Sequence, residues 1–469
     1  MKKKVLCVLL AILVSLTLFS CSKNSDSSNQ SGSSKSGKEV VRILIPGLNE
    51  QKTVDPISGL VTLSRSDLEK YLEEKIPEYD INVVSIAWDG WIQKTETLIS
   101  SGQVDVGFYT NQEAVPNWYQ DMTPFLQSDE ELNFNNLEEV LITPAVENMY
   151  YKSFNYPDST NKIYGLPYAM GCNIIMYDTK IFDDWGVPYP TSDDTFQDLV
   201  EMAKKMTGVN PVTGKQNYGA YVYSNWAEWY ALCYDAVKVY HDESGTMDIA
   251  DFDVKEYVDY IKDSPEVLAF FSGLTDLVKS SPAGIATRTG AEKFLTADND
   301  IAINFDSEGY TTSYTNYVVA DKTDVTDRFK ALFVPAGEKN NMEGFPEFYR
   351  LAISKNAKNS QAAWEVIKAI ATTPDIINYI LTNYYTSKLS VLRDVDDIEF
   401  MQIPLNKERH EYQLEHLLVT DDYWNWRTPL MSVDSEIISG TITAEQAREK
   451  FYEGVLNWVN NIKARQGKN

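Results

Sequence analysis

Residues 40–45 read VVRILI, a short β-rich run that a proline and a glycine close. Two more runs of this kind stand at residues 81–86 and 104–108. Between the runs, apolar side chains recur at helical spacing over residues 68–76 and 91–99. Strand and helix therefore alternate, which is typical of a parallel α/β sheet. In such a sheet, ligands bind beyond the carboxyl ends of the strands.

A second α/β block follows the first. Residues 173–177 and 218–223 are strand-like, and residues 195–206 form an amphipathic helix between them. Residues 301–305 predict a further strand and residues 362–371 a further helix. We therefore expect two α/β lobes, and no fixed-period repeat occurs in the sequence.

The composition excludes several classes of protein. The chain has 469 residues, 42 Lys and Arg against 68 Asp and Glu, and 12% aromatic residues. The aromatic content predicts a packed core, and the net charge of -26 argues against binding nucleic acid or an anionic membrane surface. The four cysteines and three histidines lack the spacing of a metal site or redox motif, so we expect no metal and no cofactor.

The amino terminus has the pattern of an exported lipoprotein. Residues 1–20 combine three lysines with an apolar run too short to span a membrane, which predicts a signal peptide. The run ends at Leu-Phe-Ser-Cys, which resembles a bacterial lipobox with Cys21 as the lipidated residue. Residues 21–38 are serine-rich and predict a flexible tether. We expect a protein anchored by lipid alone on the extracellular face of a bacterial cell membrane; simple secretion is the alternative.

Five further motifs follow one another along the chain. They are LISSGQVDV (98–106), KIYGLPY with MYDTKIF (162–168 and 176–182), KFLTADNDIA (293–302), LAISKNAKN (351–359) and GTITAEQA (440–447). Their order resembles the extracellular solute-binding proteins of ABC importers, in the large sugar-binding group that includes maltose-binding protein. Two positions depart from that pattern: Asp178 stands where asparagine is usual, and GFPEFYR at residues 344–350 replaces a glycine-rich loop.

The resemblance implies a fold of the periplasmic-binding-protein type II, a two-lobed α/β clamp with a hinge. Lobe 1 is expected at residues 39–170 and 336–388, and lobe 2 at residues 171–335 and 389–469. The chain is expected to cross between the lobes near residues 168–172, 335–341 and 387–393. Closure on a ligand presents the lobes to permease subunits, while another chain hydrolyses ATP because no nucleotide-binding loop occurs here. The protein is expected to be a monomer without catalytic residues.

A carbohydrate presents apolar C–H faces and rings of hydroxyl groups. Aromatic rings cover such faces, and amide and carboxylate groups bind the hydroxyls. Aromatic and polar residues of this kind follow several predicted strands, and the resemblance places ligand contacts at some of the same loci. The candidate ligand-binding residues are Trp88, Tyr109, Asn111, Trp226, Trp229, Asp306, Tyr310, Glu347, Tyr349, Trp424 and Trp426.

Alternatives remain open at this point. Each aromatic ring could instead pack in the core, and Asp306 and Glu347 could be helix caps or solvated charges. The same fold could bind a peptide or a polyamine, which the acidic charge would suit. More remote alternatives are an exported glycoside hydrolase with paired carboxylates and a surface-structural lipoprotein. The identity of the sugar and any pairing of Cys172 with Cys233 do not follow from the sequence.

Overall fold

The computed structural model describes residues 37–465 with internal gaps. The gaps are 57, 111–114, 152–156, 160, 172–173, 192, 223–253, 284–292, 306, 334–346 and 417–422. The predicted signal peptide, Cys21 and nearly all of the predicted tether therefore lie outside the described residues, as do Cys172 and Cys233. Among the helices that are described, none is long and apolar enough to cross a membrane.

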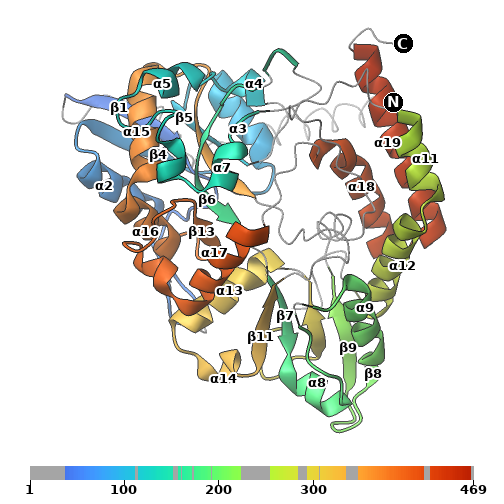
Figure 1. Cartoon of the computed structure of the whole chain (residues 1–469). Coiled ribbons are helices and arrows are strands. Elements are labelled where there is room, and N and C mark those ends of the chain that lie inside the picture. The colour runs from blue at the N-terminus through green and yellow to red at the C-terminus, as the bar shows by residue number, and fades with distance from the viewer. Residues whose placement is uncertain are drawn as a thin grey trace, which may run out of the picture.

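The first lobe is built on a sheet of six strands (Figure 1). In the order β13-β6-β12-β5-β1-β4, the strands are Lys388–Ser390, Leu166–Gly171, Phe348–Ile353, Val106–Tyr109, Glu39–Leu44 and Tyr79–Val84. Strand β1 pairs in parallel with β4 and β5, while β12 runs antiparallel to β5 and β6. The alternation of strand and helix predicted over residues 40–108 is confirmed.

Helices pack against this sheet, and most are short. They are α2 (Arg65–Lys75), α3 (Trp91–Ser100), α4 (Val115–Trp118), α5 (Thr123–Ser128), α6 (Leu137–Val140), α7 (Thr143–Glu147), α15 (Ser360–Thr372) and α16 (Pro374–Asn383), with the 3-10 turns η1 (Pro157–Ser159) and η3 (Glu399–Gln402). Helix α2 begins with a capping box, in which the Ser64 hydroxyl accepts from the Asp67 amide and the Asp67 carboxylate accepts from the Ser64 amide. This cap fixes the residue at which helix α2 begins.

The second lobe carries a sheet of five strands. In the order β11-β7-β10-β9-β8, they are Phe329–Phe333, Ile174–Asp178, Ile301–Asn304, Gln216–Tyr221 and Gly208–Val209. Its helices are α8 (Thr179–Trp185), α9 (Phe196–Lys205), α11 (Val254–Asp263), α12 (Pro265–Lys279), α13 (Ser307–Val319), α14 (Thr323–Thr326), α18 (Tyr423–Ile438) and α19 (Ala444–Arg465). Strand β7 runs antiparallel to both β10 and β11, while β9 and β10 are parallel. The sheet of this lobe is therefore mixed, since it contains both parallel and antiparallel pairs of strands.

Each lobe has its own hydrophobic core, which locates the boundaries between the lobes. The first core continues through Leu389, Val391 and Met401, and strand β13 pairs with β6 of the same sheet. The predicted boundary after residue 388 is therefore wrong, because it would remove the last strand from the first sheet. Residues 389–401 therefore belong to lobe 1, and helix α17 (Pro404–His416), which follows, still contacts η3 and β13 of that lobe.

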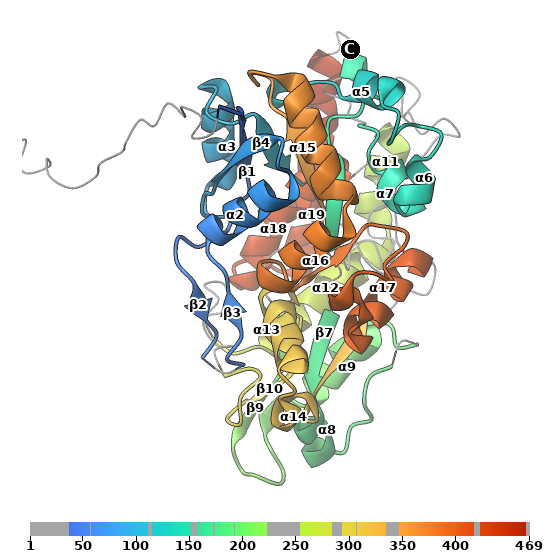
Figure 2. The same cartoon turned by 90° about the vertical axis from the view of Figure 1, so that its left-hand side faces the viewer.

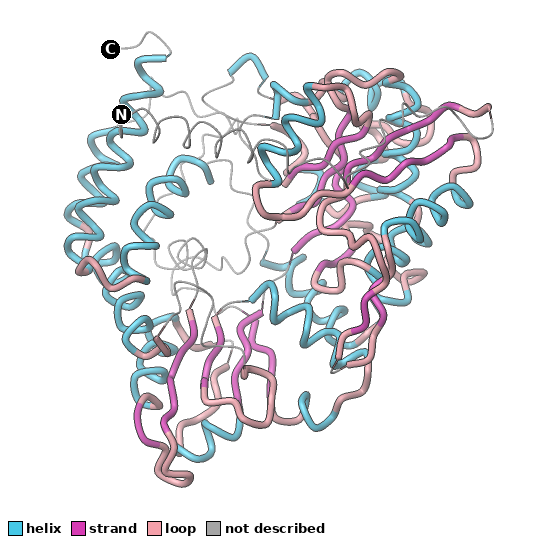
Figure 3. Tube along the Cα trace, turned by 180° about the vertical axis from the view of Figure 1, so that it is seen from behind, coloured by secondary structure: helices cyan, strands magenta, loops and turns pink. Residues whose placement is uncertain are grey.

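A small hairpin extends from lobe 1 toward lobe 2. Its strands are β2 (Thr53–Val54) and β3 (Val61–Thr62), and its tip lies beside helix α13 (Figures 2 and 3). Tyr317 of α13 is buried, and this burial, together with the charge of Asp55 in the hairpin, raises the pKa of Tyr317. The hairpin therefore reaches the second lobe at a place outside the chain crossings.

Candidate functional site

Several loops of lobe 1 meet at one end of its sheet. Strands β1, β4 and β5 are parallel, so their carboxyl ends lie together. Strand β6 ends there at Gly171, and the antiparallel strands β12 and β13 begin there. Strand β7 of lobe 2 starts at Ile174, so this end faces the second lobe. We call it the crossing end of the first sheet, with Gly47, Trp88, Gly171, Glu347 and Lys388 as its residues.

An exposed tryptophan occupies part of the crossing end. Trp88 follows β4 and is 40% exposed, although its ring contacts Trp91 and Phe108 edge-on at centroid distances of 5.9 and 5.8 Å. Its Nε1 lies only 2.3 Å from where a β-carbon on Gly47 would stand, so only glycine leaves room for the ring. Trp88 is therefore held from one side while part of its surface stays open to a ligand.

An ion pair between a buried lysine and a partly exposed glutamate lies at the same end of the sheet. The Lys388 ammonium donates to Glu347 Oε2 at 2.8 Å, and its Nζ lies 4.5 Å from the centroid of the Tyr349 ring. The Lys388 side chain is 3% exposed and that of Glu347 is 34% exposed. The Tyr349 ring lies 6.0 Å from the Trp88 ring, centroid to centroid. The Tyr349 ring thus lies next to both the Trp88 ring and the Lys388 ammonium, which in turn pairs with Glu347.

Arg350 supports the crossing end from inside the lobe. It is buried in β12 and donates to the Thr110 carbonyl at 2.6 Å, to the Phe348 carbonyl at 3.2 Å and to the side chain of Asn148. Burial lowers the pKa of Arg350. The guanidinium carbon also lies 5.4 Å from the centroid of the Tyr109 ring. Arg350 therefore fixes the carboxyl end of β5, just before residues 111–114.

Two predicted tyrosines, Tyr109 and Tyr349, pack in the interior of lobe 1, and a third, Tyr310, is partly buried in lobe 2. Tyr109 is buried, stacks on Tyr119 at 5.4 Å and covers Gly165, where a β-carbon would approach its ring to 2.5 Å. This burial raises the pKa of Tyr109 to about 12. Tyr349 is buried as well, and Tyr310 packs edge-on against Phe294 in lobe 2. Each of the three rings thus has packing contacts within its own lobe.

For the remaining predicted site residues, the structure describes no side-chain contacts. Trp424 and Trp426 belong to α18, but their side chains are outside the described part of the structure. The predicted residues that lie wholly outside it are Asn111, Trp226, Trp229 and Asp306.

The lobe 2 sheet has a corresponding end. Strands β9 and β10 are parallel, and Phe333 at the end of β11 pairs with Ile174 at the start of β7. Since β10 is antiparallel to β7, β9, β10 and β11 all end toward lobe 1. Residues 223–253 continue directly from β9, and residue 306 follows β10. The predicted aromatic and acidic residues of these segments therefore follow strand ends that face lobe 1.

Lys388 and Arg350 were not predicted from the sequence as residues of this site. Arg350 carried a signal, since it is a lone charge inside the apolar strand FYRLAI. Lys388 carried none, because its three-residue strand is too short to show alternation.

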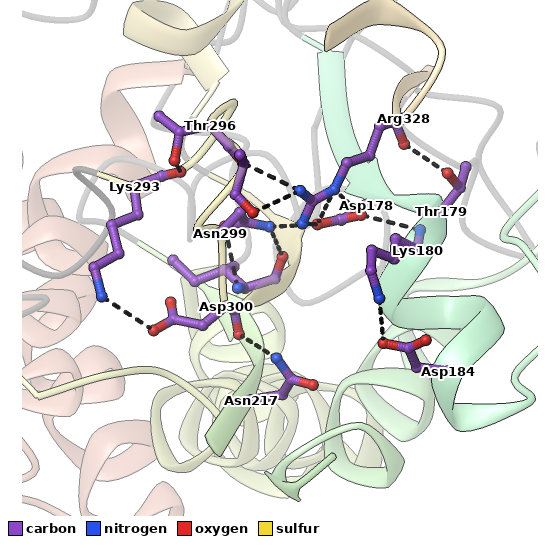
Figure 4. A network of polar contacts seen from close by, with 12 residues as sticks. Asp178, Thr179, Lys180, Asp184, Asn217, Lys293, Thr296, Asn299, Asp300 and Arg328 are labelled. Carbon is purple, nitrogen blue, oxygen red and sulfur yellow. Dashed lines mark hydrogen bonds and ion pairs between the residues drawn. The ribbon is translucent and has the colours of Figure 1, made fainter. Parts of the chain in front are cut away.

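Asp178, which stands where asparagine is usual in the resembling family, has a structural role in lobe 2. Its buried carboxylate accepts from Arg328 Nη2 at 2.6 Å and from Asn299 Nδ2 at 2.7 Å, and it caps α8 through the Lys180 amide (Figure 4). Arg328 also donates to the Ala297 carbonyl at 2.9 Å. Asp178 lies at the end of β7 away from the chain crossing. The network therefore holds lobe 2 together rather than contacting a ligand.

A separate pocket opens on lobe 1 at the beginning of β4. It encloses about 520 Å³ and is lined by residues that include Tyr79, Glu131 and Lys368. The Lys368 ammonium pairs with Asp129 at 2.9 Å and with Glu131 and Glu365. Burial by itself would raise the pKa of Asp129, but hydrogen bonds from the Trp364 indole, the Leu132 amide and the Lys368 ammonium together lower this pKa to about 2. Lys75, which also lines the pocket, pairs with Asp375 at 2.6 Å, so both of these lysines are already neutralised. Within the described residues, no group of His, Cys, Asp and Glu could hold a metal ion.

The chain is similar to known proteins in both sequence and fold. Residues 63–375 match the family model of bacterial extracellular solute-binding proteins. An ABC substrate-binding protein of Listeria monocytogenes, solved in complex with cycloalternan, superimposes with a TM-score of 0.64 at 18% identity, covering 92% of this chain and 100% of that chain. The comparison with curated proteins returned no match.

Two further solved structures are similar. A solute-binding protein of Agrobacterium vitis with bound D-mannitol has a TM-score of 0.62 and 18% identity, covering 90% of this chain and 99% of that chain. A maltose-bound protein of T. maritima has a TM-score of 0.61 and 14% identity, covering 89% and 99%. The predicted two-lobed α/β fold is confirmed.

Proposed function

Because the chain belongs to the family of bacterial extracellular solute-binding proteins, we propose that it captures a carbohydrate between its lobes and delivers it to the permease of an ABC importer. The observation that carries the proposal is that the partly exposed Trp88 ring and the partly exposed Glu347 side chain both lie at the crossing end. The two groups supply what a saccharide needs, an aromatic surface for its C–H face and an acceptor for its hydroxyls.

The ligands of similar structures support this class. Cycloalternan, D-mannitol and maltose are bound in three proteins of the same fold, and all three ligands are uncharged and rich in hydroxyl groups. We propose an oligosaccharide for this chain, since candidate aromatic residues follow strand ends in both lobes. Trp226 and Trp229 with Asp306, from lobe 2, and Asn111, from lobe 1, complete the proposed site, with Trp424 and Trp426 as further candidates.

Lobe closure would couple capture to delivery. The lobes have separate cores and are joined by chain crossings, so a ligand that contacts both lobes in the closed state shifts the equilibrium toward closure. We further propose that lipid on Cys21 anchors the protein at the membrane and that residues 21–38 serve as the tether. In this proposal the protein is a monomer, and the importer's own subunits hydrolyse ATP.

A thermal-shift screen tests the proposal. The purified full chain is mixed with neutral oligosaccharides, amino acids, peptides and polyamines. A ligand at 100 times its dissociation constant stabilises the fold by about 2.7 kcal/mol, which raises Tm by several degrees. We expect this shift with at least one oligosaccharide, which chromatography then recovers uncleaved. A shift with peptides or polyamines alone would contradict the carbohydrate proposal, and cleavage of the sugar would indicate a hydrolase instead.

A further inference from the structure

A buried ammonium group at the crossing end needs compensation. Lys388 begins β13, opposite Gly171 in the sheet, and its side chain is almost completely removed from water. An ammonium in such surroundings is stable only beside an anion or an aromatic face. Lys388 has both, since Glu347 Oε2 accepts a hydrogen bond from its ammonium at 2.8 Å and the centroid of the Tyr349 ring lies 4.5 Å from Nζ. Its position is therefore set by two groups of the crossing end.

Glu347 differs from its partner in exposure. One third of its side chain is accessible to solvent, while its Oε2 accepts a hydrogen bond from the buried ammonium. The ion pair limits the orientations of the carboxylate, and it leaves the pair with no net charge. The carboxylate is thus offered to a ligand as a fixed hydrogen-bond acceptor rather than as a free negative charge.

This arrangement has a consequence for ligand choice. A saccharide hydroxyl donates to a carboxylate without disturbing its ion pair, whereas a cationic ligand must compete with a tethered ammonium that is already in place. From these contacts we infer that Lys388 is a positioning residue that orients Glu347 toward saccharide hydroxyls and makes the site select neutral over cationic ligands. The inference rests on the proposed function, because it assigns the charge class of the ligand at that same site.

The test compares neutral and cationic probes on the full chain. The neutral probes are maltotriose, isomaltotriose, cellotriose and xylotriose, and the cationic probes are spermidine and the trimer of glucosamine. Calorimetric titration gives the dissociation constant of each probe. For the wild type, we expect binding of at least one neutral trisaccharide and none of the cationic probes.

Two variants separate the roles of the pair. In Lys388→Met, we expect the affinity for the neutral probe to fall about tenfold or more and binding of a cationic probe to become measurable, because the carboxylate is uncompensated. In Glu347→Gln, we expect the loss for the neutral probe without any gain for the cations. Lys388→Arg retains the charge and should retain the preference for neutral probes.

Controls keep the outcome interpretable. Lys355 lies just beyond the other end of β12 and is exposed, so Lys355→Met should leave both dissociation constants unchanged. Thermal unfolding reports whether each variant folds, and if Lys388→Met does not fold, Glu347→Gln alone decides the outcome. Sugar binding by the wild type with unchanged neutral-to-cationic selectivity in Lys388→Met, or unchanged sugar affinity in Glu347→Gln, would overturn the inference alone. Wild-type binding of spermidine and of no sugar would overturn both the inference and the proposed function.

Discussion

Replacing Asp178 by alanine is expected to lower the free energy of unfolding by about 4 kcal/mol. The carboxylate is completely buried and accepts hydrogen bonds from Arg328 and Asn299, and it also caps α8. Without it, the guanidinium of Arg328 loses its counter-charge while most of its side chain remains buried. Urea unfolding followed by circular dichroism measures the loss.

Two other variants calibrate this result. Asp193 is exposed in the same lobe, and Asp193→Ala should change the free energy of unfolding by less than about 0.5 kcal/mol. Asp178→Asn should cost less than the alanine variant, since the amide oxygen still accepts hydrogen bonds but carries no charge. If Asp178→Ala lost less than about 1 kcal/mol, the network would not be holding lobe 2 together.

Trp88→Ala is expected to weaken binding of the best saccharide in the thermal-shift screen by about 2 kcal/mol, roughly thirtyfold. The ring is the most exposed of the predicted aromatic side chains that the structure describes, and Gly47 holds it from behind. An exposed ring at the centre of a site contributes to binding more than to stability. Calorimetric titration measures the affinity, and the unfolding transition should shift little.

Phe134 provides a matched control for Trp88. It is 37% exposed, against 40% for Trp88, but it lies outside the crossing end. Phe134→Ala should leave the saccharide affinity unchanged. Equal affinities for the wild type and for Trp88→Ala would remove the crossing end of lobe 1 from the ligand site.

Much of the fold follows from local patterns. Residues 40–45 correspond to β1 (Glu39–Leu44), and residues 195–206 contain α9 (Phe196–Lys205), because alternation and helical spacing are visible in sequence. The hairpin of β2 and β3 and the late boundary after Met401 were not predicted. Both depend on pairing of strands two or three residues long, for which the sequence carries no periodic signal.

The site was less predictable than the fold. Strand ends were correctly placed, but which side chain at a strand end faces a ligand depends on what fills the space beneath it. Tyr109 turns inward because Gly165 leaves room for its ring, whereas Trp88 stays partly exposed above Gly47. Lys388 and Glu347 lie 41 residues apart and meet only through the pairing of β6 with both β12 and β13. Such a contact between distant residues cannot be derived from one sequence.

Small-angle X-ray scattering of the full chain, with and without a saturating oligosaccharide from the screen, tests the central claim most directly. We expect the sugar to reduce the radius of gyration, because the two lobes close on a ligand that contacts both of them. An unchanged radius at saturating sugar, or a reduction with peptides or polyamines alone, would contradict that claim.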